Sequence, residues 1–240
     1  MSWQPATVVE VITETARVKS IVLELETFPR HRPGQHVDVR LTAPDGYQAQ
    51  RSYSIASAPE DDRLVLTVER LEDGEVSSYL AGELRPGDQF DLRGPVGGYF
   101  VWDGSVQGPV LLVAGGSAVV PFRSMLRHRA AVRSTVAVRM LYSSRSLDDV
   151  IYRQELIRLA ADEEVDIRLA LTREWPEGWS GRRGRIDREL LEEVSWPAAD
   201  EPLFFICGPS GFAESIANAL VQNGQAPGLI RIERFGPTGT

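Results

Sequence analysis

The chain has 240 residues, of which 42% are hydrophobic and 25% charged, and its formal net charge is -8 at pH 7. This length allows one large domain or two ordinary ones. The negative charge argues against wholesale nucleic-acid binding. No apolar run approaches the roughly 20 residues of a membrane span, and the first five residues lack the features of a signal peptide. We therefore expect a cytoplasmic protein that binds neither nucleic acid nor membrane.

The few cysteines and histidines restrict the redox chemistry. Cys207 is the single cysteine, which excludes an internal disulfide and a protein-bound iron-sulfur cluster, because such a cluster needs about four cysteine ligands. His31, His36 and His128 show no convincing metal-ligand pattern, so no metal site is predicted. Any redox chemistry is expected to use an organic cofactor.

The first part of the chain has the pattern of an antiparallel six-stranded β-barrel. Short runs such as residues 37–42 and 64–69 alternate apolar and polar side chains. Turn signals, such as Arg32-Pro33-Gly34, separate them. Only residues 75–84 have a helical pattern here.

One run of this part, residues 51–54, carries three groups that suit a flavin nucleotide. Arg51 offers a bidentate fork to a pyrophosphate, Tyr53 can pack against a flavin or ribityl chain, and Ser54 can hydrogen-bond a ring atom. Successive side chains of a strand point to opposite faces, so these residues can divide the roles. Taken alone, the run is equally compatible with an ordinary barrel strand.

A polar segment at residues 103–108 marks the predicted boundary between a first domain, residues 1–104, and a second, residues 105–240. Beyond it, apolar runs alternate with segments of helical spacing. The runs cover residues 110–114, 135–142, 165–172, 202–207 and 229–235. They predict an α/β doubly wound five-stranded parallel sheet. Ligands of such sheets bind beyond the carboxyl ends of the strands.

Glycine-rich turns follow two of these strands. Gly115, Gly116 and Ser117 open a helix whose backbone N–H groups suit phosphates, although an ordinary tight turn is the alternative. Cys207 and the Gly208-Pro209 turn follow the fourth strand. A lone buried cysteine is usually a small core residue, which is the alternative for Cys207.

Basic side chains follow the second strand of the predicted sheet. Ser144 and Arg145 suit a phosphate monoester, with a solvated loop as the alternative, and Arg153 can add charge. Five further basic residues lie on the helix after the first glycine turn, for which a solvated helix face is the first interpretation and docking of an acidic partner the second. They are Arg123, Arg127, His128, Arg129 and Arg133.

The order of these motifs resembles the ferredoxin-NADP reductase family over residues 5–236. The resemblance is carried by RSYSIAS (51–57), GEVSSYL (74–80), GPVGGYF (94–100), LLVAGGSAVVPF (111–122), YSSRSLDDVIY (142–152), FFICGPSGF (204–212) and IERF (232–235). It implies an FAD-binding barrel followed by an NAD(P)-binding α/β domain. The cofactor-binding residues that it implies are Arg51, Ser52, Tyr53, Ser54, Gly74, Glu75, Val76, Ser77, Gly115, Gly116, Ser117, Ser144, Arg145, Arg153, Cys207, Gly208, Pro209 and Phe235.

The resemblance also implies a reaction, in which a hydride passes from the nicotinamide C4 to the flavin N5 and electrons then leave one at a time. The implied catalytic residues are Ser54 near N5, Cys207 beside the nicotinamide, and Glu233, which stabilises or relays a proton. The expected cofactors are FAD and NADPH, since Ser144 and Arg145 match the family's pair for the 2′-phosphate. NADH is the alternative, because Asp148 and Asp149 lie nearby.

Two residues depart from the family pattern. Ala118 stands where the turn usually has glycine, which is tolerable if the backbone is helical there and costly if φ is positive. Phe235 replaces the more familiar tyrosine, which keeps the ring for stacking and loses the hydroxyl.

The resemblance leaves the electron acceptor open. A fused ferredoxin domain is absent from this sequence, so we expect a separate acceptor protein of iron-sulfur, haem or flavodoxin type. The alternatives are a reductase of free flavin or ferric chelates, and a non-catalytic flavin-binding subunit or sensor. The sequence does not specify an oligomeric state.

Overall fold

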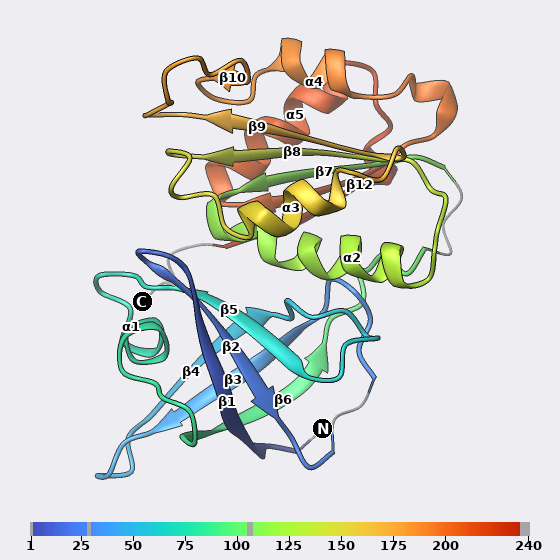
Figure 1. The fold of residues 1–240 in the computed structure, drawn as a ribbon. Helices are drawn as coiled ribbons and strands as arrows, with labels where there is room; N and C mark the ends of the chain where they lie inside the picture. The colour runs from blue at the N-terminus through green and yellow to red at the C-terminus, as the bar shows by residue number, and fades with distance from the viewer. Residues whose placement is uncertain (1, 28–29, 105–107, 236–240) are drawn as a thin grey trace. The chain divides into compact units, whose positions relative to one another are not determined.

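A computed structural model describes residues 2–27, 30–104 and 108–235. The chain forms two compact units, and each is considered by itself. The first comprises Met1–Asp103 together with Val120–Ala131, and the second comprises Gly104–Val119 together with Val132–Thr240. Figure 1 shows the elements of both units. Part of the predicted boundary segment, residues 105–107, lies outside the described residues.

The first unit is built on a six-stranded antiparallel sheet with the strand order β4-β3-β6-β1-β2-β5. Its strands are β1 (Gln4–Thr15), β2 (Val18–Glu24), β3 (His36–Thr42), β4 (Gln48–Ser54), β5 (Leu64–Glu69) and β6 (Gln89–Val96). An antiparallel bridge between Ile55 and Leu66 joins the end of β4 to β5, so the two edges of the sheet meet. The predicted six-stranded barrel is confirmed.

The interior of the barrel comes from the alternation that the sequence shows. Val37 and Val39 of β3 are fully buried, as is Leu66 of β5. Helix α1 (Glu75–Gly82) covers this interior with Val76 and Leu80. The helix ends at Gly82, two residues before the predicted end, because glycine is a poor helix former and Pro86 disfavours helix shortly after it.

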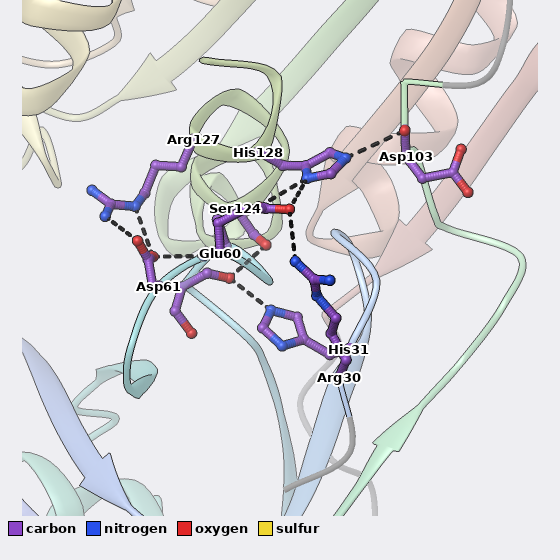
Figure 2. Close-up of polar contacts among 10 residues, drawn as sticks. Arg30, His31, Glu60, Asp61, Asp103, Ser124, Arg127 and His128 are labelled. Atoms are coloured by element: carbon purple, nitrogen blue, oxygen red, sulfur yellow. Dashed lines mark hydrogen bonds and ion pairs between the residues drawn. The ribbon is translucent and has the colours of Figure 1, made fainter. Parts of the chain in front are cut away.

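Helix α2 (Val120–Ala131) belongs to the first unit, and polar contacts hold it there (Figure 2). The Ser124 hydroxyl donates to the carbonyl of Ser57 at 2.7 Å. The Arg127 guanidinium donates to the Asp61 carboxylate at 2.9 Å. His128 Nδ1 lies 3.0 Å from a carboxylate oxygen of Glu60. The helix thus binds residues of the first unit that precede it by more than sixty positions in the sequence.

These contacts correct both interpretations of the basic residues on α2. Arg127 is paired with Asp61, Arg123 donates to the Ala56 carbonyl at 3.2 Å, and only 2% of Arg129 is exposed. The helix therefore offers neither a solvated basic face nor a free arginine cluster for an acidic partner. Arg133, the fifth of these residues, lies beyond the end of the helix and is exposed.

The second unit contains a parallel sheet with the strand order β10-β9-β8-β7-β11-β12. Its strands are β7 (Val110–Gly115), β8 (Val138–Ser144), β9 (Val165–Leu171), β10 (Arg182–Arg183), β11 (Leu203–Gly208) and β12 (Ile230–Arg234). The five predicted strands are present. The sixth, β10, was not predicted because two arginines form no apolar run.

Helices connect the strands of this sheet, as the doubly wound prediction requires. The α-helices of the unit are α3 (Arg153–Leu159), α4 (Arg188–Val194) and α5 (Ser210–Gln222), and the 3₁₀ helices are η1 (Gly116–Val119), η2 (Ala198–Asp200) and η3 (Pro227–Leu229). Leu191 of α4 and Ile216 of α5 pack on Leu111, Phe204 and neighbouring strand residues in one buried cluster. No helix in the described ranges is long and apolar enough to cross a membrane.

Candidate functional site

Strand β4 presents its predicted flavin residues on two faces. Tyr53 lies opposite Val37, and Arg51 opposite Val39, on the face that turns toward the barrel interior. The Tyr53 ring packs against the core, and burial raises the pKa of its phenol. Arg51 is exposed. Tyr53 therefore offers a neutral ring for packing, while Arg51 keeps a solvent-facing charge.

Ser54 lies on the other face, with 4% of its surface exposed. Its hydroxyl has no hydrogen-bond partner among the described residues. A buried polar group without a partner costs about 1 to 3 kcal/mol, so such groups call for an explanation. A bound ring with a polar edge would provide the missing partner, and Ser54 thus fits the flavin that the sequence predicts.

The Ser52 hydroxyl bonds to the neighbouring strand. It donates to Asp38 Oδ1 on β3 at 2.7 Å. Its predicted contact with a cofactor stays a prediction. The role of Asp38 was missed, because its importance depends on the register between β3 and β4.

The start of α1 has the geometry of a phosphate site. Gly74 caps the helix with extended backbone and no side-chain hydrogen bond. The first N–H groups of a helix, here those of Glu75, Val76 and Ser77, have no acceptor within the helix. Together with the helix dipole they favour an anion.

Local contacts keep this helix start in place. A Cβ atom on Gly74 would lie 2.2 Å from Ser77 Oγ, so glycine is needed there. The Ser77 hydroxyl donates to the Gly74 carbonyl at 3.2 Å. The Tyr47 hydroxyl donates to Glu75 Oε2 at 3.2 Å. The helix start is therefore linked to the residue directly before β4, the strand that carries Arg51.

In the second unit, the first glycine turn follows β7. Gly116 has a φ of +63°, a conformation that favours glycine. Ala118 lies in the 3₁₀ helix η1 and is not among the described residues with positive φ. The methyl group at this departure from the family pattern is therefore accommodated without backbone strain. Ser117 lies between them, at the start of the turn's helix.

Phe212, a residue without a predicted role at the site, packs over both glycine turns. A Cβ on Gly208 would lie 2.5 Å from its ring, and one on Gly115 would lie 3.2 Å from it. The glycines therefore admit this ring close to the ends of β7 and β11. Pro209 is the N-cap of α5, with φ -54° and ψ 148°, and directly precedes the helix that carries Phe212.

Cys207 and Glu233 are neighbours on the paired strands β11 and β12. The cysteine is fully buried. Burial, reinforced by the charge of Glu233, raises the pKa of the thiol well above its ordinary value. Cys207 is consequently a neutral thiol that shapes its surroundings, since nucleophilic cysteines need the thiolate.

Glu233 has an unusual carboxyl group. Its Oε2 atom is buried and has no hydrogen-bond partner within the described residues. Burial raises its pKa from 4.5 to about 7. A carboxyl with such a pKa exchanges its proton near neutral pH, which suits a proton relay.

Replacing Glu233 with glutamine is expected to stabilise the protein at alkaline pH. The raised pKa means that the native state holds the proton more tightly, so stability falls as pH rises from 4.5 to about 7. Glu233→Gln should abolish this fall and add about 1 to 2 kcal/mol to the free energy of unfolding at about pH 8, allowing for partial exposure. Urea unfolding across this pH range measures it, with exposed Glu164→Gln as the control. An unchanged pH dependence in Glu233→Gln would contradict the assignment.

The end of β8 carries the predicted phosphate residues. Ser144 is buried, and its carbonyl accepts from the Thr172 backbone N–H at 2.9 Å, which fixes the strand end. Arg145 and Arg153 are exposed, and Arg145 forms no ion pair within the described part of the chain. Asp149 accepts from the Ser146 hydroxyl at 2.7 Å.

Phe235 completes the group at the carboxyl edge of the sheet. Its backbone N–H donates to the Gly208 carbonyl at 3.0 Å, and 36% of its surface is exposed. The parallel sheet thus brings Gly115, Cys207, Glu233 and Phe235 to the carboxyl ends of neighbouring strands. Residues 236–240 lie outside the described ranges.

Known proteins resemble the chain along most of its length. Residues 5–101 match the family model of the oxidoreductase FAD-binding domain, and residues 112–218 that of the oxidoreductase NAD-binding domain. Ferredoxin-NADP reductase B of Sorangium cellulosum is 39% identical over 181 residues, which cover 73% of this chain and 72% of the relative. The glycine betaine monooxygenase reductase subunit of Chromohalobacter salexigens is 32% identical over 236 residues.

The chain is shorter than the second of these relatives, since the match covers 96% of this chain and 63% of the relative. Among solved structures, the FAD/NAD-binding domain of nitric oxide dioxygenase from Vibrio cholerae has a TM-score of 0.87 and 27% identity, covering 98% of this chain and 99% of that domain. Strand β4 with its predicted flavin residues, the glycine turns after β7 and β11, and these similarities all point to the same family. The chain belongs to the ferredoxin-NADP reductase family and is an oxidoreductase with FAD-binding and NAD(P)-binding domains.

Proposed function

We propose that the protein takes electrons from NADPH through FAD and delivers them one at a time to a separate protein of iron-sulfur, haem or flavodoxin type. We assign FAD to residues 1–104 and the nicotinamide nucleotide to residues 105–240. The observation that carries the proposal is the buried hydroxyl of Ser54, which has no hydrogen-bond partner among the described residues and follows Tyr53 directly in β4. The name of one relative, a monooxygenase reductase subunit, supports a separate acceptor.

Residues of the first unit hold and orient the flavin nucleotide in this proposal. Bound FAD supplies a group that accepts two electrons together and releases them singly. Arg51 and the N–H groups at the start of α1 bind the pyrophosphate. Tyr53 packs against the ring system, and the Ser54 hydroxyl donates to the ring edge at N5. The charged and polar groups thus face the pyrophosphate and the polar ring edge, and the Tyr53 ring faces the apolar ring system.

Residues of the second unit bind the nicotinamide nucleotide. The turn at Gly116 and Ser117 accommodates the pyrophosphate, while Ser144, Arg145 and Arg153 lie at the end assigned to the 2′-phosphate. Cys207 borders the nicotinamide as a neutral thiol, and Phe235 offers an aromatic ring at the same edge. Glu233 holds or releases a proton at its buried carboxyl oxygen.

Anaerobic stopped-flow spectroscopy tests the proposed function. The protein, loaded with FAD, is expected to lose its flavin absorbance on mixing with NADPH, and to lose it more slowly with NADH. Reoxidation by small acidic iron-sulfur proteins should then exceed reoxidation by free flavin or ferric chelates at equal concentration. Flavin that neither NADPH nor NADH reduces would favour a non-catalytic flavin protein. Faster turnover with free flavin or ferric chelates would favour a small-molecule reductase.

A further inference from the structure

A row of polar side chains crosses three strands of the barrel and begins on β4, the strand that carries the predicted flavin residues. Ser52 of β4, Asp38 of β3 and Arg93 of β6 lie opposite one another in the strand register. Ser52 Oγ donates to Asp38 Oδ1 at 2.7 Å. Arg93 donates to Asp38 Oδ2 through Nη2 at 2.7 Å and Nε at 3.2 Å. Asp38 thus accepts three hydrogen bonds and links the edge strand β4 to β6 across β3.

A second row lies next to the first and ends before it reaches β4. Arg40 of β3 donates to Asp91 of β6 at 2.7 Å and 3.2 Å. The ring of Trp3 lies 4.4 Å from the Arg40 guanidinium and 4.8 Å from that of Arg93, within cation–π range. The two rows therefore share one aromatic ring and similar ion pairs, but among the described residues only the first row forms a side-chain hydrogen bond to β4.

The ion pairs of both rows are partly sheltered from solvent. The Asp38 side chain is 12% exposed and that of Arg93 38%, while Arg40 and Asp91 are 24% and 35% exposed. Charge-assisted bonds of this kind are stronger than those between neutral groups. Partial burial opposes ionisation of Asp38, yet the bonds from Arg93 and Ser52 outweigh it, and the pKa of Asp38 is lowered. Asp38 is therefore a fixed carboxylate at neutral pH.

Ser52 stands two residues before Ser54, on the same face of the strand, and directly before Tyr53. Strand β4 is the outermost strand in the order of the sheet and pairs with β3 alone, apart from the bridge that follows it. A side-chain bond to β3 at Ser52 therefore adds to the main-chain bonds that orient the two flavin residues. Functional side chains need such support to stay within about half an ångström of their working positions.

We propose that Asp38, clamped by Arg93, is a positioning residue that fixes β4 through Ser52 and so sets the Ser54 hydroxyl and the Tyr53 ring for the flavin. Asp38 itself does not touch the cofactor. This inference rests on the proposed function. It assigns to Ser52 an indirect role in flavin binding in place of direct contact.

The matched variants are Asp38→Asn and Asp91→Asn, because each removes the charge that one Trp3-stacked arginine faces. FAD titration of the apoprotein should show affinity roughly tenfold weaker in Asp38→Asn, equivalent to about 1.4 kcal/mol. FAD affinity in Asp91→Asn should stay within about twofold of the wild type, a difference below about 0.5 kcal/mol. Flavin reduction by NADPH should also slow in Asp38→Asn alone. Equal effects of the two variants on FAD affinity and reduction would overturn the inference.

A double-mutant cycle with Ser52→Ala tests whether Ser52 and Asp38 act on FAD affinity as a unit. If Ser52 acts through Asp38, the double variant Asp38→Asn/Ser52→Ala should bind FAD no more weakly than the single variant with the lower affinity. Ser52→Thr keeps the hydroxyl and should bind FAD as tightly as the wild type. If Ser52 touches FAD directly, the losses of the two single variants will multiply, which would overturn the inference. A wild-type protein that binds no FAD would instead overturn the proposed function itself.

Discussion

Replacing Ser54 with alanine is expected to slow the reduction of bound FAD by NADPH about a hundredfold, the scale seen when one preorganised donor to a reacting centre is removed. Stopped-flow absorbance at saturating NADPH measures the rate. The reason is the environment of the hydroxyl, which is buried and has no partner among the described residues. A hydroxyl held away from water needs no reorganisation when it meets the flavin edge.

The apoprotein of the same variant supplies a second measurement. Because the Ser54 hydroxyl has no partner in the part of the chain that the structure describes, removing it should leave the free energy of unfolding unchanged or raise it by up to about 1 kcal/mol. The control variant is Ser78→Ala. It removes a hydroxyl that has a partner, since Ser78 donates to the Leu71 carbonyl at 3.0 Å near the start of α1. Full flavin content with an undiminished rate of reduction in Ser54→Ala would remove Ser54 from the reaction.

The second large effect concerns the choice of nicotinamide cofactor. Arg145→Ala should weaken NADPH binding roughly ten- to hundredfold, since a hydrogen bond to a charged group contributes about 1.5 to 3 kcal/mol. NADH lacks the 2′-phosphate, so its binding should barely change. The exposed guanidinium has no ion pair within the described residues, so it is available to the nucleotide.

Dissociation constants for both cofactors, measured by titration of the FAD-loaded protein, give the ratio directly. Arg158→Ala is a suitable control, since Arg158 is an exposed arginine in the last turn of α3, the helix that Arg153 begins. Equal losses for NADPH and NADH would show that Arg145 does not read the phosphate. Tighter binding of NADH by the wild type would show the same.

The sequence was most informative where the relevant periodicity is short. Alternation of side chains predicted that Arg51 and Ser54 lie on different faces of one strand. Parallel strands end at one edge of a sheet, so the sequence predicted that the glycine-rich turns after Ala114 and Cys207 face the same edge, and β7 and β11 pair in that way. Helix α4 also has a local signal, since Asp187 directly precedes it and its carboxylate accepts from the Leu190 N–H at 2.9 Å as an N-cap.

Features that depend on distant partners were missed or misread. The Ser52 hydroxyl binds Asp38 because β3 and β4 pair in one register, and no short motif encodes that register. The basic residues of α2 have no local sign of their burial, because their partners Asp61 and Glu60 lie more than sixty residues earlier. Such contacts follow only from the assembled unit.

The attachment of α2 to the barrel affects how this protein can be divided. A fragment that ends at residue 103 would omit α2 and leave Asp61 without Arg127, the Ser57 carbonyl without Ser124, and Glu60 without His128. An exchange of nucleotide domains between relatives at that point would also replace the helix that the barrel binds. Designers of chimeric reductases therefore have to choose α2 by its match to the barrel, although its sequence lies within the other domain.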